Sequence, residues 1–269
     1  MSPASTPHSL SPRRGIHHEV KQPTAEIPKE FHHEVKQPTA EIPKEFHREV
    51  KQPTAEIPKG FLFDMDGTLV DSLSDIGNAM NVVLASYGFP QHAIETYKTL
   101  VGEGARSLVE KSLPKDAQHR AGEALTRYKA RYATHLVVES KPYEGIVELL
   151  TELSARGDKL GVVTNKPHDA AVGVMTKLFP EIHFAIVVGQ KDGTPHKPDP
   201  SGALLAAQAL GTAPSETFFV GDTDTDMKTA TNAGMIAVGV LWGFRDEAEL
   251  KSHGARHIVL HPRDLLALR

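Results

Sequence analysis

The chain has 269 residues and a formal net charge of −4, with 39% hydrophobic and 24% charged residues. This composition is typical of a globular protein and lacks the basic excess of most nucleic-acid-binding domains. The sequence contains no cysteine, which excludes disulfides, thiol nucleophiles and cysteine-ligated zinc. No apolar run approaches the roughly 18 residues of a membrane span, so we expect a cytoplasmic protein without nucleic-acid or membrane partners.

The N-terminal segment, residues 1–60, consists largely of a repeat. The 15 residues HHEVKQPTAEIPKEF at positions 17–31 recur at 32–46 and, with two substitutions, at 47–61. Each copy carries two prolines, which interrupt helices and central strands. Val, Ile and Phe are the only large apolar residues in a copy, too few to offset the entropy of ordering it. We therefore predict a disordered tail over residues 1–60 and assign it no chemistry.

From Phe61 onward, short apolar runs alternate with helical patterns. The predicted strands are 60–63, 160–163, 185–188, 217–220, 235–240 and 257–260. The predicted helices between them include 144–156, 201–210 and 224–233. Strand and helix alternating at this spacing predict an α/β fold with a Rossmann-like, doubly wound parallel sheet.

Residues 74–140 break this alternation, because they show helical periods and no convincing strand. One apolar stripe runs from Ile76 to Leu84, and a second helical pattern covers residues 117–136. We predict a helical domain inserted at 74–140, which divides the α/β core into residues 61–73 and 141–269. A helical layer within a single domain is the alternative.

Polar side chains follow four of the predicted strands, at the carboxyl ends where open parallel sheets bind ligands. The four segments are Asp64-Met65-Asp66-Gly67-Thr68, Thr164-Asn165-Lys166, Lys197-Pro198 and Gly221-Asp222 with Asp226 four residues later. Carboxylates that converge in a crevice need a balancing cation, and oxygen ligands favour Mg²⁺ over zinc. Hydroxyls, a lysine and a glycine turn add groups suited to a phosphoryl ligand.

These four motifs, in this order, resemble those of the haloacid dehalogenase-like (HAD) hydrolase superfamily over about residues 61–262. The insert after the first motif resembles the C1-type cap of that superfamily. The segments DMDGTLVDS, VGEGARSLVEKSL, PYEGIVELL and GVVTNKP resemble the phosphoglycolate phosphatase group.

The resemblance implies a role for each motif residue in a two-step hydrolysis. Asp64 is the expected nucleophile, and Asp66 the expected acid and base. Mg²⁺ is expected on Asp64, the Asp66 backbone carbonyl and Asp222, with Asp226 orienting the site from behind. The remaining groups are expected to contact the phosphoryl group or the substrate: Thr164, Lys197, Gly67, Thr68 and Asn165.

The second acid, Asp66, favours a phosphatase over a dehalogenase, since a departing halide needs no proton. The resemblance implies that the substrate is a small phosphorylated metabolite, with 2-phosphoglycolate as the leading candidate. Arg106 is the candidate cation for its carboxylate, although Glu103 nearby would oppose an anion unless it pairs with Arg106. A β-phosphoglucomutase, a pyrophosphatase, a nucleotide phosphatase and a non-enzymatic scaffold with a partner-binding tail stay open. The sequence does not indicate the oligomeric state.

Overall fold

The computed structural model describes residues 59–268. The predicted tail, apart from its last two residues, lies outside this range, and the prediction made for it is not addressed by the structure. None of the helices that the structure describes has the length and apolar character needed to cross a membrane.

A six-stranded sheet forms the centre of the described chain, and each neighbouring pair of its strands is parallel. The strand order is β5 (Ile186–Gln190), β4 (Lys159–Pro167), β1 (Gly60–Phe63), β6 (Thr217–Gly221), β7 (Ile236–Val240) and β8 (His257–Val259). The two central strands, β1 and β6, are buried along their whole length, as expected of short apolar runs covered on both faces.

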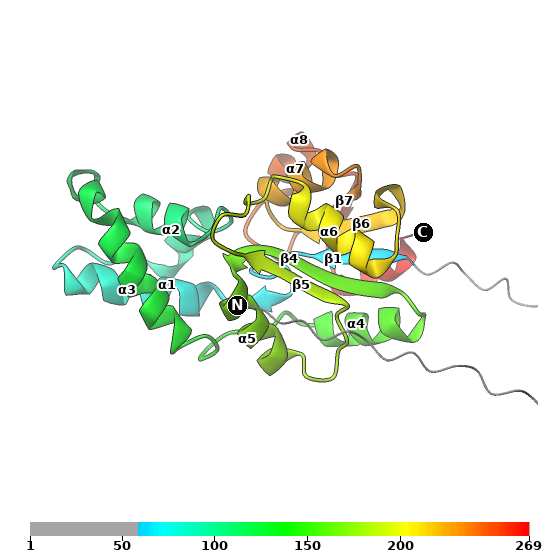
Figure 1. Cartoon of the computed structure of the whole chain (residues 1–269), viewed down its shortest axis with the longest axis horizontal. Coiled ribbons are helices and arrows are strands. Elements are labelled where there is room, and N and C mark those ends of the chain that lie inside the picture. Colours follow the sequence, from blue (N-terminus) through cyan, green and yellow to red (C-terminus); the bar gives the residue numbers. More distant parts are fainter. Residues whose placement is uncertain (1–58, 269) are drawn as a thin grey trace, which may run out of the picture. The chain divides into compact units, whose positions relative to one another are not determined.

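Helices cover both faces of the sheet (Figure 1). One face carries α4 (Ile146–Ala155), α5 (His168–Leu178) and the short turn η4 (Pro262–Ala267). The other carries α6 (Ser201–Leu210), α7 (Asp224–Asn232) and α8 (Glu247–Ser252), with the turn η3 (Pro214–Glu216) before β6. The predicted α/β fold with a doubly wound parallel sheet is confirmed.

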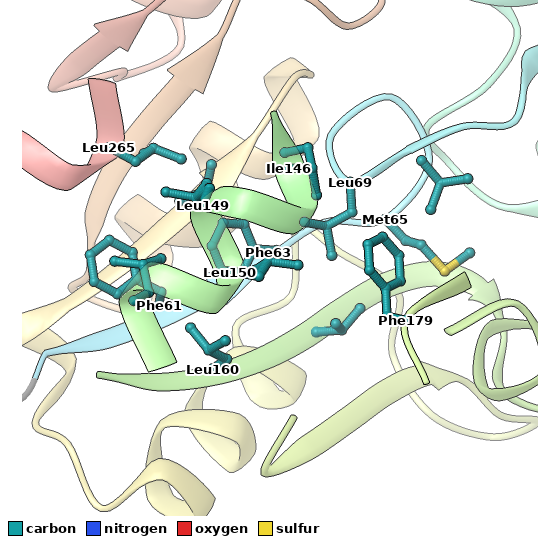
Figure 2. Close-up of a cluster of buried hydrophobic side chains, with 14 of the residues drawn as sticks. Phe61, Phe63, Met65, Leu69, Ile146, Leu149, Leu150, Leu160, Phe179 and Leu265 are labelled. Atoms are coloured by element: carbon teal, nitrogen blue, oxygen red, sulfur yellow. The ribbon is translucent and has the colours of Figure 1, made fainter. Parts of the chain in front are cut away.

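Side-chain alternation along β1 divides the core into two clusters. Phe61 and Phe63 point to the α4 face, where Figure 2 shows them with Leu149 and Leu150. Leu62, between them, packs on the opposite face against residues of α6 and α7. Because successive strand residues face opposite sides, a fully apolar strand supplies both layers at once.

A separate group of helices, here called the helical unit (residues 73–133), packs around its own apolar cluster. It comprises α1 (Leu73–Ser86), η1 (Ile94–Thr99), α2 (Ala105–Ser112), η2 (Lys115–Arg120) and α3 (Ala121–Ala133). The chain leaves the core through β2 (Val70–Asp71) and returns through β3 (Lys141–Pro142), and these two short strands pair antiparallel. The two connections to the helical unit therefore lie side by side.

Most elements lie within about two residues of their sequence-based bounds, and two differ more. The strand predicted at 160–163 continues to Pro167, because β5 pairs with it as far as Gln190 across an irregular register. Thr164 and Asn165 consequently lie inside β4, not after it. The helix predicted over 117–136 begins as the 3-10 turn η2 and becomes α-helical only at Ala121.

Candidate active site

Asp64 follows β1 directly and is held at the carboxyl edge of the sheet. Its backbone N–H donates to the Val220 carbonyl of β6 at 2.9 Å, which extends the ladder by one residue. The chain then turns sharply, and three successive N–H groups converge on the Met65 carbonyl. Gly67 in this turn has a φ of 91°, and a Cβ there would lie 2.3 Å from Asp222 Oδ2. The turn thus brings the backbone against Asp222, which no side chain at position 67 would allow.

Three carboxylates gather at this edge. Oxygens of Asp64, Asp222 and Asp226 lie within 4.8 Å of one another, and all three residues are buried. Lys197 Nζ lies 2.8 Å from Asp64 Oδ1 and 2.7 Å from Asp226 Oδ1. The predicted residues from three separate motifs are therefore brought together around one lysine.

Asp226 serves two structural purposes at once. Its second oxygen, Oδ2, accepts from the Thr223 N–H at 3.0 Å and from the Thr223 hydroxyl at 2.7 Å. The first of these bonds and the Asp226 N–H, which donates to the Thr223 hydroxyl at 3.4 Å, form the capping box of α7, so the helix start fixes the carboxylate that holds Lys197. This geometry agrees with the orienting role expected of Asp226.

The electrostatics of the cluster reflect burial of like charges. Burial raises the pKa of Asp64 to about 6 from its ordinary value of 3.8, although Lys197 opposes this shift. Burial and the charges of Asp226 and Asp64 raise the pKa of Asp222 well above its usual range. Burial alone would lower the pKa of Lys197, but the two carboxylates that it contacts outweigh this and raise it.

The donor set fits a divalent cation. Three carboxylates against one ammonium leave the cluster with an excess of negative charge. Asp64 Oδ1 is buried. Among residues 59–268 its ion pair with Lys197 is its one polar contact, and it accepts no hydrogen bond of good geometry. Oxygen-only ligands of this kind suit Mg²⁺.

The second acid, Asp66, lies beside the cluster with different partners. Its Oδ1 accepts from the Ser72 hydroxyl at 2.6 Å, and Lys166 Nζ lies 2.9 and 3.0 Å from its two oxygens. Lys166 is buried, and the sequence analysis gave it no role although it directly follows Thr164 and Asn165. Its position inside β4 is the signal that could have identified it.

Two residues expected to bind substrate are occupied within the protein. The Thr68 hydroxyl donates to Asp222 Oδ1 at 2.8 Å. The Asn165 amide donates to the carbonyls of Gly102 and Lys197 and accepts from the Lys197 N–H at 2.8 Å. Thr68 thus orients a carboxylate, and Asn165 ties the Lys197 loop to the helical unit. Thr164 and Asn165 both line the cavity described below.

Arg106 lies away from the site. Its side chain is 65% exposed and pairs with Glu110 at 3.3 Å, one turn along α2. Glu103, which could have opposed an anion, instead contacts Lys111 at 2.8 Å and the Ser107 hydroxyl at 2.8 Å. Arg106 is not among the residues that line the cavity described below, and its assignment to the substrate stays a prediction.

A loop after β7, which the sequence analysis missed, closes the site from behind. The Phe244 N–H donates to Asp222 Oδ2 at 2.9 Å, and the Trp242 indole donates to the Thr68 carbonyl at 2.9 Å. A Cβ on Gly243, between them, would lie 2.3 Å from the Asp222 Cβ. A glycine flanked by aromatic residues after a predicted strand was the available signal.

A cavity of about 530 Å³ opens between the strand ends and the helical unit. Asp64, Asp66 and Thr164 line it from the sheet, and the helical unit contributes a largely apolar wall: Ile76, Val101, Leu108, Tyr128 and Tyr132. Its size is that of a typical small-molecule pocket. The arrangement places two buried carboxylates, Asp64 and Asp66, in the lining of a pocket for a small ligand.

Known proteins share this sequence and this fold. The family model described as haloacid dehalogenase-like hydrolase matches residues 61–240. The chain is 35% identical over 207 residues to the N-acetylmuramic acid 6-phosphate phosphatase of Pseudomonas aeruginosa, covering 76% of this chain and 92% of that protein. It is 32% identical over 207 residues to the phosphoglycolate phosphatase of Aquifex aeolicus, covering 77% and 94%.

A solved structure leads to the same family. A haloacid dehalogenase-like hydrolase of Streptococcus pneumoniae superposes with a TM-score of 0.70 at 30% sequence identity, covering 78% of this chain and 97% of that one. The matched region contains all four motifs and the carboxylate cluster that they build. The chain therefore belongs to the haloacid dehalogenase-like hydrolases and falls in their phosphoglycolate phosphatase-like group.

Proposed function

We propose that this protein is a Mg²⁺-dependent phosphatase that hydrolyses a small phosphomonoester through a phosphorylated Asp64. The leading candidate substrate is 2-phosphoglycolate. The observation that carries the proposal is the placement of Asp64 and Asp66 on the wall of one cavity, with Lys197 in contact with Asp64. Relatives with this fold that are named phosphoglycolate phosphatase support the choice of substrate.

In the first step, an Asp64 oxygen forms a bond to phosphorus as the ester P–O bond breaks. Asp66 gives a proton to the departing ester oxygen, which leaves as an alcohol. Lys197 balances negative charge on Asp64 and on the phosphoryl oxygens, and the Thr164 hydroxyl donates to one of those oxygens. The Gly67 N–H donates to the Val70 carbonyl at 2.9 Å, so the turn at Gly67 shapes the phosphoryl site without donating its own N–H to it.

In the second step, water attacks the phosphorus of the aspartyl-phosphate and Asp66 takes its proton, which releases phosphate and restores Asp64. Asp64, the Asp66 carbonyl and Asp222 would hold Mg²⁺. The ion would supply charge stabilisation to the phosphoryl group in both steps. The helical unit would act as the cap that excludes bulk water from this site.

N-acetylmuramic acid 6-phosphate is a second candidate substrate. The observation in its favour is the 35% identity to a phosphatase of that compound. A cavity of about 530 Å³ is of a size that accepts either a two-carbon ester or a larger sugar phosphate.

A screen of phosphorylated metabolites, scored by phosphate release with Mg²⁺ present, tests the proposal. We expect 2-phosphoglycolate or N-acetylmuramic acid 6-phosphate to have the highest kcat/KM. The absence of phosphate release from every monoester would refute it, whereas conversion of a sugar phosphate to its isomer would indicate a mutase. Deleting residues 1–58 should leave turnover intact; loss of turnover would favour a role for the tail. A cytoplasmic location stays part of the proposal.

A further inference from the structure

The Tyr132 hydroxyl is a buried polar group without a partner. Tyr132 lies on α3, is 4% exposed, and lines the cavity above Asp66. Its hydroxyl forms no hydrogen bond with any residue in the described range 59–268. Buried polar groups in proteins are almost always paired, and the exceptions call for a ligand, an ion or water as the missing partner.

Packing accounts for the ring but not for the hydroxyl. The ring stacks on Tyr128 with centroids 5.7 Å apart and planes inclined by 14°. Phenylalanine would fill the same space without leaving a buried hydroxyl unpaired, which is a cost to the folded protein. The hydroxyl at this position therefore indicates a contact with something that enters the cavity.

Lys166 supplies a positive charge over the ring that carries this hydroxyl. Its Nζ lies 4.5 Å from the centre of the Tyr132 ring, and its side chain is buried and lines the same cavity. The other two lysines that line it, Lys129 and Lys191, are exposed. Two N–H groups of Lys166 are accounted for by the oxygens of Asp66, which leaves one donor.

The two groups together select the chemistry of their ligand. An ammonium can only donate hydrogen bonds, and a hydroxyl beside it completes a pair of donors. The remaining ammonium donor from β4, together with the hydroxyl from the largely apolar wall of the helical unit, suits a carboxylate. Because Lys166 contacts Asp66, the expected acid for the leaving group, and both line the same cavity as Asp64, the carboxylate would belong to the leaving group, a few bonds from the ester oxygen.

We propose that Tyr132 Oη and Lys166 Nζ form a subsite that binds a carboxylate of the leaving group, which makes these two residues determinants of substrate specificity. The inference rests on the proposed phosphatase function, because that function sets the orientation of the ligand: the phosphoryl group lies at Asp64 and the leaving group lies toward Tyr132 and Lys166. The subsite is an alternative to Arg106, which does not line the cavity.

The test compares two ligands that differ in this group alone: 2-phosphoglycolate, and ethyl phosphate, which has a methyl group where the carboxylate stands. Binding is measured by calorimetry with Mg²⁺, in the full-length chain carrying Asp64→Asn so that no turnover occurs. We expect at least about a hundredfold tighter binding of 2-phosphoglycolate, in line with two hydrogen bonds to a charged group.

Adding Tyr132→Phe should remove about tenfold of this preference while the ring stays in place, and Lys166→Met should remove it almost entirely. The matched control is Tyr87→Phe, since Tyr87 also has a buried unpaired hydroxyl within the described residues but lies outside the cavity lining. It should leave the preference unchanged.

Three results would overturn the inference. The Asp64→Asn chain could bind both ligands equally well, the preference for 2-phosphoglycolate could survive both substitutions, or Tyr132→Phe could lower the affinity for both ligands by the same factor. Phosphate release by the wild-type chain is measured in parallel. Turnover of 2-phosphoglycolate without a Tyr132-dependent preference would refute the subsite and keep the phosphatase. A Tyr132-dependent preference without turnover would refute the phosphatase and keep the subsite.

Discussion

The two walls of the cavity are built in different ways. On the sheet side, the charged groups of the cluster contact partners: Lys197 bridges Asp64 and Asp226, and Asp222 accepts from Thr68 and the Phe244 N–H. On the side of the helical unit, the wall is mainly apolar and contains the Tyr132 hydroxyl, unpaired among the described residues.

This difference indicates that the two walls have different functions. Groups at strand ends are fixed by the backbone ladder, which suits chemistry that needs close control of position. Side chains on a helical surface can be exchanged without disturbing that ladder, which suits discrimination between leaving groups. This difference between the walls would be contradicted if substitutions on the sheet side changed only substrate specificity, or if substitutions on the helical side abolished turnover.

The largest effect is expected at Asp64. Asp64→Asn should lower kcat by at least about 10⁴-fold, because the amide cannot attack phosphorus. Phosphate release in single-turnover and steady-state assays measures this. Asp224→Asn is the control from the same edge, since the Asp224 side chain pairs with Lys228 on α7. Near-normal turnover by Asp64→Asn would contradict the assignment of the nucleophile.

Asp66→Asn should lower kcat by about 10² to 10⁴-fold, the usual range for a lost general acid. Binding of substrate should persist. The deficit should shrink in the first step with p-nitrophenyl phosphate, whose leaving group departs without a proton. An equal deficit for alkyl and nitrophenyl esters in that step would argue against proton donation by Asp66.

Mg²⁺ and pH should act together on the stability of the sheet side. Without metal, the folded protein holds the Asp64 proton up to a pKa of about 6, above the ordinary 3.8. The folded state thus binds more protons than the unfolded state between these values, and stability falls as pH rises through that window. The difference between the two pKa values corresponds to roughly 3 kcal/mol.

Denaturant melts in EDTA from pH 4 to pH 7 would measure this loss. Asp64→Asn should flatten the profile, and Mg²⁺ should restore stability near neutral pH by balancing the carboxylates. A metal-free protein whose stability rises across this window, in the wild-type chain and the Asp64→Asn variant alike, would show that the cluster is not strained by its own charge.

The smallest effect concerns the junction of the helical unit with the core. Asp75 on α1 accepts hydrogen bonds from three successive N–H groups, of Val138, Glu139 and Ser140, and from the Ser140 hydroxyl. Burial raises the pKa of Asp75, but these hydrogen bonds outweigh burial and lower the pKa below its ordinary value. Asp75→Ala should cost about 2 kcal/mol by leaving buried donors unpaired.

Thermal and denaturant melts check this, with Glu95→Gln as the control because the Glu95 side chain forms an exposed pair with Lys98. The sign of the pKa shift means that the contribution of Asp75 is present at neutral pH and is lost as pH falls through its lowered pKa. A stability unchanged by Asp75→Ala would show that the junction does not depend on this carboxylate.

The sequence by itself determined the fold class, the order of the motifs along the strands and two members of the acidic cluster, Asp64 and Asp222. Fully apolar strands such as Gly60–Phe63 and Thr217–Gly221 can only be buried on both faces, and parallel strands bring their carboxyl ends to one edge. Asp64 and Asp222 therefore meet for reasons that are local to each strand, whereas Lys197 is held in place by Asn165 of β4.

Only the tertiary structure decided which side chains face the cavity from elsewhere. Arg106 and Tyr132 both lie on helices of the helical unit, yet one is turned to solvent and the other is buried above Asp66. Lys166 and the Trp242–Phe244 loop reach the site through strand extension and loop packing. Helical periodicity fixes which residues share a face, but the rotation of that face toward the sheet depends on contacts between segments remote in sequence.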